Sequence, residues 1–384
     1  TTKGDYAYES APNSTDLTWE TVITKNIGLD LGFLNNRLNV SFDAYIRDTK
    51  DMLMAGKTLP GVYGASSPRM NVADLRTKGW EASVTWGDSF TLASKPFNYR
   101  IMAGIGDNTS KVTKYDNPNR TLTDPYEGQQ LGEIWGYVVD GYFKTDEEAR
   151  NYKVDQSFVN QMINASALDN GLHAGDLKFV DLDGNNKIEQ TTSANDRKDM
   201  KVIGNSLPRY NYNFGISADW YGIDFSVLFQ GIGKQNWYPG AETSMFWGPY
   251  SRPYASFIPS DFMSQVWSEE NTNAYFPRPR GYVALGSNRE LAVVNTKYLQ
   301  NLAYCRLKNL SIGYTLPDKW LSKIGFEKIR VYFSGENLLT FTKLHSDYID
   351  PEQASASNSW KTSKSDANIY PWAKTYSFGV DITF

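Results

Sequence analysis

The 384-residue sequence lacks most of the features that common soluble enzymes carry. Its single cysteine, Cys305, excludes an internal disulfide, and its only two histidines, His173 and His345, are far apart in the chain. The motifs H-E-x-x-H, C-x-x-C, G-x-S-x-G and G-x-x-x-x-G-K-[ST] are all absent. We therefore expect no enzymatic activity and no redox or organic cofactor.

The charge balance and the hydropathy exclude two further classes of protein. A net charge of −4 and a pI near 5.4 give no general attraction to nucleic acid, so we expect no nucleic-acid partner. No run of about 18 apolar residues occurs, which excludes a membrane-spanning helix. A membrane β-barrel stays open, because alternating strands average to low hydropathy in any window.

Aromatic residues are abundant, at 14% of the chain, and the C-terminus shows how some of them are arranged. Large apolar residues alternate there with small or polar ones, at Tyr376, Phe378, Val380, Ile382 and Phe384. In a strand, the two sets point to opposite faces. Taken alone, the segment fits either a wall between lipid and water or a half-buried strand of a soluble sandwich.

The same alternation recurs in eight other segments, at 27–33, 38–47, 80–86, 97–105, 210–218, 223–230, 309–316 and 329–334. Short turns such as Asn35-Asn36 and Tyr221-Gly222 alternate with long connections, the largest being 111–209 and 231–303. Outer-membrane barrels have short periplasmic turns and long extracellular loops. We therefore predict an all-β fold, a transmembrane antiparallel β-barrel in which 111–209 and 231–303 are large extracellular loops.

The charged members of these strands are expected on the face opposite the lipid, because charge facing lipid is costly. They are Arg47, Glu81, Arg100, Asp224 and Arg330. Nine strands leave an open edge, and an open edge cannot face lipid. Together with a first residue that is Thr and no export signal, this predicts that residues 1–384 are one part of a barrel. The remaining wall is expected from an N-terminal part or from another chain.

One loop segment has the spacing of a calcium-binding loop. Asp181, Asp183 and Asn185 offer side-chain oxygens at positions one, three and five of an EF-hand-type loop. Lys187 stands at position seven, where the backbone carbonyl is the ligand. Hard Ca²⁺ requires clustered oxygens, so the segment is a candidate structural calcium site.

Two departures from the calcium pattern leave an alternative open. Asn186 occupies the usual glycine position, and Thr192 stands where the bidentate acid is expected. Asp196, four residues further on, is a candidate replacement that would fold back onto the ion. The alternative interpretation is an Asx-rich turn that holds no ion.

The connection 231–303 is rich in aromatic residues among Pro, Gly and Arg. We consider Trp237, Trp247, Tyr250 and Tyr254 as candidates for contact with a substrate or a partner protein. The alternative is that these rings pack the loop against itself.

Several phrases resemble the SusC/RagA family of TonB-dependent outer-membrane transporters. They are Leu17-Thr-Trp-Glu20, Asn35-Asn-Arg-Leu38, Lys78-Gly-Trp-Glu81, the stretch 175–188 followed by Val202-Ile-Gly204, Arg306-Leu-Lys-Asn309, Gly335-Glu-Asn-Leu338, Asp350-Pro-Glu352 and the terminal 376–384. The matches run from end to end in the order of the family.

The resemblance implies the C-terminal part of a 22-stranded barrel, with about nine of its strands supplied by this chain and a plug outside it. It implies active import of oligosaccharides or oligopeptides across the bacterial outer membrane, driven by TonB through the missing N-terminal region. A SusD-like surface lipoprotein would cap the barrel, outer-membrane lipid would surround it, and 376–384 would be the signal for barrel assembly. The alternative is a passive or adhesive barrel without energised transport.

Overall fold

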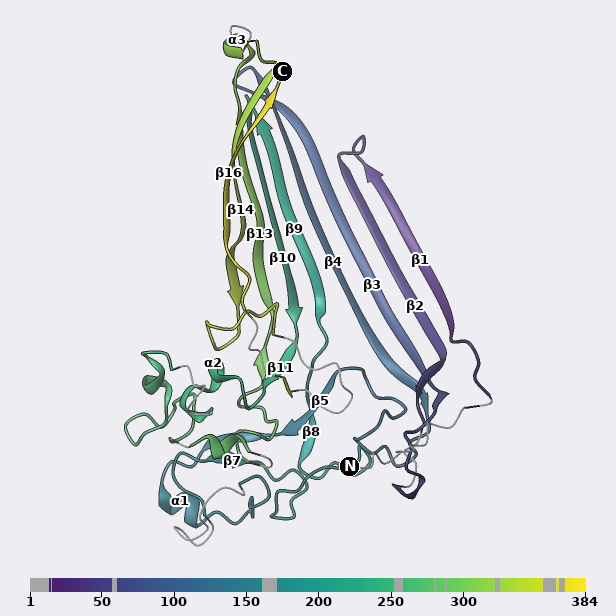
Figure 1. The fold of residues 1–384 in the computed structure, drawn as a ribbon, viewed down its shortest axis with the longest axis vertical. Helices are drawn as coiled ribbons and strands as arrows, with labels where there is room; N and C mark the ends of the chain where they lie inside the picture. The colour runs from purple at the N-terminus through teal and green to yellow at the C-terminus, as the bar shows by residue number, and fades with distance from the viewer. Residues whose placement is uncertain are drawn as a thin grey trace, which may run out of the picture.

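The computed structural model describes residues 14, 16–56, 61–160, 171–251, 258–279, 281–286, 289–321, 325–354, 364–365 and 370–384. Its main feature is one long antiparallel sheet, shown in Figure 1, which we call the wall. The strands of the wall follow one another along the chain, in the order β1 (Thr21–Phe33), β2 (Leu38–Ala55), β3 (Arg69–Leu92), β4 (Lys95–Tyr115), β9 (Arg209–Trp220), β10 (Ile223–Lys234), β13 (Tyr304–Thr315), β14 (Lys328–Thr342) and β16 (Thr375–Thr383). All nine alternating segments are therefore strands of one meander, which confirms the predicted antiparallel architecture.

Several strands are longer than the alternation predicts. Strand β2 continues to Ala55, and β3 and β4 form a hairpin that extends from Arg69 to Tyr115. The segment 87–92, beyond the alternating segment 80–86, also belongs to β3. At the far end of β4, along 106–115, backbone pairing continues without the apolar alternation that marks the strand centres, so the sequence pattern ends before the strand does.

Tight turns join the strands at one end of the wall, and residues with left-handed backbone make them. Asn35 and Asn36 have φ of 57° and 62°, and Ala93 and Ser94 have φ of 48° and 63°. Between β9 and β10 the turn is Tyr221-Gly222, and glycine suits the second position because its φ is +82°. The β13–β14 connection, with α3 (Asp318–Leu321), lies at this same end, and the longest connections lie at the opposite end of the wall, as Figure 1 shows.

The wall does not close. Strands β1 and β16 are the two ends of the sheet, and within the described residues each pairs with one neighbour. Every residue of β1 is exposed. No helix among the described residues is long and apolar enough to cross a membrane.

The long connections 116–208, 235–303 and 343–374 pack together beyond the end of the wall, and we call their described parts the loop assembly. It contains the strands β5 (Glu133–Tyr137), β6 (Val139–Tyr142), β7 (Leu177–Phe179), β8 (Met200–Asn205), β11 (Asn236–Pro239), β12 (Gln300–Asn301) and β15 (Lys364–Ser365). Its helices are α1 (Asp146–Arg150), α2 (Ser244–Trp247), η2 (Gly248–Tyr250), η4 (Phe262–Gln265) and η5 (Tyr282–Leu285), whereas η1 (Gly61–Tyr63) and α3 (Asp318–Leu321) lie in other connections. All three connections contribute to one hydrophobic core, for example through Phe179, Trp247 and Ile349.

Candidate functional site

The register of the wall separates an apolar face from a polar one. Directly paired residues form an apolar row across all nine strands, at Phe33, Leu38, Trp86, Ile101, Ile216, Val227, Leu310, Gly335 and Tyr376. A row on the other face is polar throughout, at Arg100, Ser217, Ser226, Ser311, Ser334 and Ser377. The register shifts in the β2–β3, β3–β4, β10–β13 and β13–β14 pairings lie outside these two rows, so the two faces stay separate across the strands that the rows join.

The predicted charged residues lie on the polar face, where their partners are also polar or small. Arg330 donates to Asp224 at 2.6 and 2.9 Å and to Asp381 at 3.2 Å, and thereby links β10, β14 and β16. The side chains reach across Gly313 of the intervening β13, where a Cβ would collide with both Asp224 and Arg330. This part of the polar face is therefore charged but internally paired.

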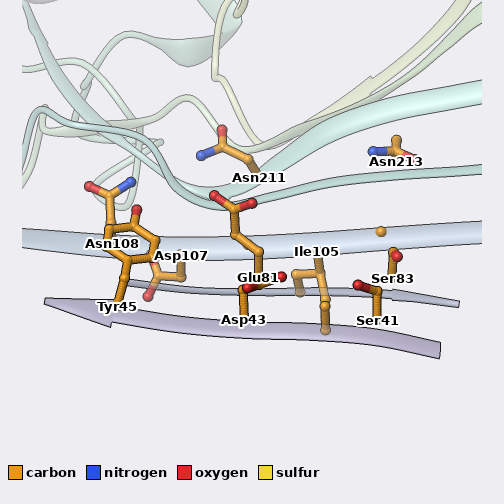
Figure 2. Close-up of a pocket in the computed structure, with 13 residues that line it drawn as sticks. Ser41, Asp43, Tyr45, Glu81, Ser83, Ile105, Asp107, Asn108, Asn211 and Asn213 are labelled. Carbon is orange, nitrogen blue, oxygen red and sulfur yellow. The ribbon is translucent and has the colours of Figure 1, made fainter. Parts of the chain in front are cut away.

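A groove of about 370 Å³ lies on the polar face between β2, β3, β4 and β9, as Figure 2 shows. Its lining includes Tyr45, Asn108 and Asn211, which supply hydroxyl and amide groups. Asp43 and Glu81 are paired in register and lie side by side in the groove. Such a surface suits hydroxyl- or amine-bearing groups.

Of the carboxylates that line the groove, Asp107 forms an ion pair with Arg209 at 2.5 Å, whereas Asp43 and Glu81 differ from the paired carboxylates beside Arg330. Asp43 accepts from Asn26 Nδ2 at 3.1 Å, and Asp30 accepts from Ser41 Oγ at 2.5 Å. No lysine or arginine among the described residues forms a salt bridge with Asp30, Asp43 or Glu81. The groove therefore keeps an uncompensated negative charge.

The aromatic candidates of the connection 231–303 occupy the interior of the loop assembly. Trp237 and Trp247 have no exposed surface, and Tyr250 is 1% exposed. Tyr250 donates its hydroxyl to Pro277 O at 2.7 Å, and the Trp247 indole N–H donates to Gly240 O at 3.0 Å. These three rings pack the loop against itself and offer no surface to a ligand or partner, which differs from the expectation of contact residues. Tyr254 lies outside the described residues.

These rings are buried because a long connection of mixed polarity is stabilised only when its apolar residues form a core of their own. A buried polar network accompanies the rings. Asn295 donates to the Tyr238 hydroxyl at 2.8 Å and accepts from the backbone N–H groups of Lys297 and Tyr298. Burial raises the pKa of both tyrosines well above the usual range, so they remain neutral hydrogen-bonding groups.

The acidic loop brings together two of the predicted calcium ligands and one residue that sequence reasoning missed. Carboxylate oxygens of Asp181, Asp183 and Asp199 lie within 4.8 Å of one another. Asp199 is buried and accepts from the backbone N–H groups of Leu182 at 2.9 Å and Glu189 at 2.7 Å. Burial, followed by the nearby Asp183 and Asp181 charges, raises the pKa of Asp199.

The other predicted ligands are placed differently. Asn185 Oδ1 accepts from the backbone N–H of Lys187 at 2.8 Å, which keeps this amide within the turn. Asn186 takes the left-handed conformation, with φ of 63°, that glycine usually supplies at this position. Asp196 is exposed and pairs with Ser193, and it is not part of the carboxylate cluster. Asp199, and not Asp196, lies beside Asp181 and Asp183, and binding of a cation at these three carboxylates stays a prediction.

A cluster of ion pairs joins two of the sequence segments that resemble the transporter family, one around Arg306 and one around Asp350. Arg306 of β13 donates to Asp350 at 2.7 Å and to Glu352 at 2.6 Å, and only 2% of its surface is exposed. Lys308 adds a second cation, 2.8 Å from Glu352. We call these four residues the ion cluster. It ties the wall to the connection 343–374.

The terminal strand β16 pairs with β14 over its whole length. Phe378 and Val380 lie opposite Phe333 and Val331, so Tyr376, Phe378, Val380, Ile382 and Phe384 continue the apolar face. All five are exposed within the described chain. Their role as an assembly signal stays a prediction.

An antiparallel meander with one continuous apolar face and one polar face, joined by tight turns at one end, defines a segment of a transmembrane β-barrel. The model of the family described as TonB dependent receptor-like, beta-barrel matches residues 2–338. The chain belongs to this family, which confirms the resemblance found in its sequence. The family consists of receptors rather than enzymes, in agreement with the expected lack of enzymatic activity.

Curated relatives carry the same family name. TonB-dependent receptor P3 of Formosa agariphila is 28% identical over 388 residues, covering 96% of this chain and 34% of the relative. TonB-dependent receptor SusC of Bacteroides thetaiotaomicron is 24% identical over 371 residues, covering 96% of this chain and 32% of the relative. The chain therefore spans about a third of the length of these relatives.

Solved structures agree on the fold. The chain resembles a structure of the RagAB peptide transporter with a TM-score of 0.67 and 21% identity, covering 97% of this chain and 36% of that one. It also resembles the RagAB peptide importer in its "open-open" state, with a TM-score of 0.68 and 22% identity, covering 96% of this chain and 35% of that one. At this identity the likeness establishes the fold of the wall and loops alone.

Proposed function

We propose that the whole protein of which this chain is a part imports nutrient oligomers across the bacterial outer membrane, energised through TonB. The observation that carries this proposal is the apolar row that crosses all nine paired strands, with a mainly polar face opposite it. An apolar outer face suits outer-membrane lipid, and a polar inner face suits a water-filled passage. Membership of the receptor family supports the coupling to TonB, which would act through the N-terminal region outside this chain.

We infer oligosaccharides or oligopeptides as the substrate class, received together with a SusD-like surface lipoprotein. The groove lined by Asp43, Glu81, Asn211 and Asn213 supports a ligand that is rich in hydrogen-bonding groups. The likeness to the RagAB peptide transporter supports oligopeptides, and the hydroxyl and amide groups of the groove support oligosaccharides equally well. The alternative, a passive or adhesive barrel, shares the wall and differs in its dependence on energy.

The test uses the full-length receptor in its bacterial host. Cells are offered labelled oligosaccharides and oligopeptides, with and without a protonophore and with and without a functional tonB gene. The proposal expects saturable uptake that both treatments abolish, and a lipoprotein that co-purifies with the receptor in mild detergent. Uptake or adhesion that persists after both treatments would instead establish the passive alternative.

We propose in addition that the acidic loop binds a structural Ca²⁺ through Asp181, Asp183 and Asp199. The mutual proximity of the three carboxylates and the raised pKa of Asp199 support this assignment. The ion would hold the loop 181–199 without taking part in transport. Titration of the chelated full-length receptor with Ca²⁺, read by calorimetry, should give one site that Asp183→Asn weakens about tenfold or more and that exposed Asp124→Asn leaves unchanged. Absence of saturable binding would leave the loop as an Asx-rich turn.

A further inference from the structure

A second cavity, of about 340 Å³, lies in the loop assembly and is separate from the groove on the wall. The segment 120–135 forms one side of it, and the segment 194–202 forms the other. Strands β5 and β8 pair between these segments and hold the two sides together. The volume falls within the range of small-molecule sites, roughly 300–1,000 Å³.

The lining of this cavity is strongly basic in a protein whose net charge is negative. Arg120, Arg197 and Lys201 line it, and none of them forms a salt bridge with another described residue. The only carboxylate in the lining, Glu133, already accepts from the Tyr126 hydroxyl at 2.6 Å and from the Gln130 backbone N–H at 2.9 Å. The cavity therefore carries uncompensated positive charge.

Two buried donors in the same lining lack an acceptor. Arg120 Nε and Trp135 Nε1 are both inaccessible to solvent and have no hydrogen-bond partner within the described part of the chain. The Trp135 indole N–H still approaches the Tyr126 hydroxyl closely enough to act as a weak donor, which opposes the increase in the pKa of Tyr126 caused by burial and Glu133. Buried donors are normally satisfied, so Arg120 Nε above all indicates an acceptor that arrives with a ligand.

The rim of the cavity is held in place before any ligand arrives. Asn117 fixes the turn that leads into Arg120, because its Oδ1 accepts from Thr121 N at 3.0 Å and its Nδ2 donates to Pro125 O at 3.1 Å. Leu122 N donates to Thr192 O at 2.9 Å, which joins the two sides. The Arg120 guanidinium lies 4.8 Å from the centre of the Tyr126 ring. A preformed site of this kind loses little conformational entropy on binding.

We propose that this cavity binds an acidic sugar unit through its oxyanion, a carboxylate or a sulfate. The lining is rich in donors and poor in free acceptors, so it favours a group made of acceptor oxygens. A peptide backbone would also bring N–H donors, for which the cavity offers no free carboxylate. Arg197 and Lys201 line the cavity and are exposed, so they attract the anion, and Arg120 offers it a third cation with an unsatisfied donor.

This proposal deepens the proposed function, and only its link to import rests on that function. An acidic unit held in the loop assembly would make the imported oligomer an acidic glycan. Binding itself is a property of the loop assembly, and it is measurable without transport.

The test is calorimetric titration of the full-length receptor in detergent at low salt. The probes are D-glucuronate, D-glucose 6-sulfate, neutral D-glucose, and triglycine with a free C-terminal carboxylate. We expect saturable binding of at least one acidic sugar, no binding of glucose, and weaker binding of triglycine. Glucuronate and glucose 6-sulfate separate the two sources of the oxyanion. Tighter binding of triglycine, or equal binding of glucose, would overturn the assignment.

The variants test the location. Arg197→Gln and Lys201→Gln should each weaken binding of the acidic sugar about tenfold, because each removes a charged partner. Lys153→Gln removes an exposed cation elsewhere in the same connection and should bind as the unaltered receptor does. Trp135→Phe, which removes one buried donor, should weaken binding severalfold. If Arg197→Gln and Lys201→Gln bind like Lys153→Gln, the cavity is not the site.

Uptake assays separate the two proposals. Uptake of acidic oligomers that depends on TonB but is unchanged in Arg197→Gln would remove the role of the cavity in import and leave importer function intact. If the receptor bound acidic sugars but its uptake did not depend on TonB, the proposed TonB-driven import would be wrong and the proposed acidic-sugar site would still stand.

Discussion

The wall and the loop assembly are built from one chain, yet they are stabilised in opposite ways. Nearly all residues of β1 and β16 are exposed, and no layer of the described structure covers the apolar face. The loop assembly buries Trp237, Trp247 and Phe276 almost completely in a core of its own. The wall thus depends on lipid and on the rest of a barrel, whereas the loop assembly is built like a water-soluble domain.

The polar groups of the two regions follow the same division. On the wall, Arg330 and Asp381 form an ion pair in which the aspartate is largely exposed. In the loop assembly, Asn295 is fully buried and all of its side-chain polar atoms are satisfied. Removing one partner of a polar interaction should therefore reduce the free energy of unfolding much more in the loop assembly than on the wall. The following predictions test this contrast, from the largest expected effect to the smallest.

The largest effect is expected where the two regions join. Arg306→Met leaves the buried carboxylate of Asp350 without its cation, which should reduce the free energy of unfolding by about 3–5 kcal/mol. Hydrogen exchange of the full-length receptor should show lost protection in 344–354. The matched variant Lys308→Met removes a half-buried cation and should cost about 1 kcal/mol or less. Equal effects would mean that burial of the ion cluster is unimportant.

A charge on the apolar face tests the dependence of the wall on lipid. Ile312 belongs to the apolar face of β13, and Ile312→Arg should destabilise the receptor in lipid vesicles by about 2–4 kcal/mol. The neighbouring Ser311→Arg places the same charge on the polar face and should have little effect. Urea unfolding in vesicles measures both. If Ser311→Arg destabilised the receptor more than Ile312→Arg, the assignment of the apolar and polar faces would have to be reversed.

A tyrosine pair compares hydrogen bonding in the two regions. Tyr238 donates to Leu291 O at 2.8 Å and accepts from Asn295 in a buried site. Tyr238→Phe should therefore cost about 1–3 kcal/mol. Tyr210, on β9, is 42% exposed, and Tyr210→Phe should change stability by less than about 0.5 kcal/mol. Chemical denaturation of each variant gives the comparison, and a costly Tyr210→Phe would contradict it.

The smallest effect is a pH dependence confined to the loop assembly. The pKa of Asp199 is raised in the folded chain, so ionisation of this carboxyl opposes folding. Its penalty is absent below the unfolded pKa, near 3.9, and develops as pH rises through the raised folded value. In a chelator, local stability around 182–199 should therefore fall with rising pH in this window. Hydrogen exchange measures it, and Asp199→Asn should flatten the profile; an unchanged profile would assign the effect to another group.

Much of the wall was predictable from the sequence, because alternation along a strand reports directly which face each side chain occupies. The tight turns were predictable for the same local reason, since Asn35, Asn36 and Gly222 accept left-handed backbone. The ends of β3 and β4 were not, because polar residues continue the pairing without a periodic signal. Contacts between residues far apart in the chain were not predictable from the sequence. Asp199 lies close to Asp181 only in the folded chain, and Arg306 donates to Asp350, which is 44 positions away.

The shared core of the three long connections also sets an order of assembly. Phe179, Trp247 and Ile349 belong to segments separated by complete hairpins of the wall. Contacts so distant in sequence form late, because the intervening chain must first be ordered. We therefore expect the strands of the wall to pair first and the aromatic core of the loop assembly to form last. Pulse proteolysis during refolding would reveal this as early protection of the wall and late protection of the loops, and the reverse order would refute it. A chain halted between the two steps would leave its loop tryptophans exposed to water, and such a chain would be the form most open to proteases.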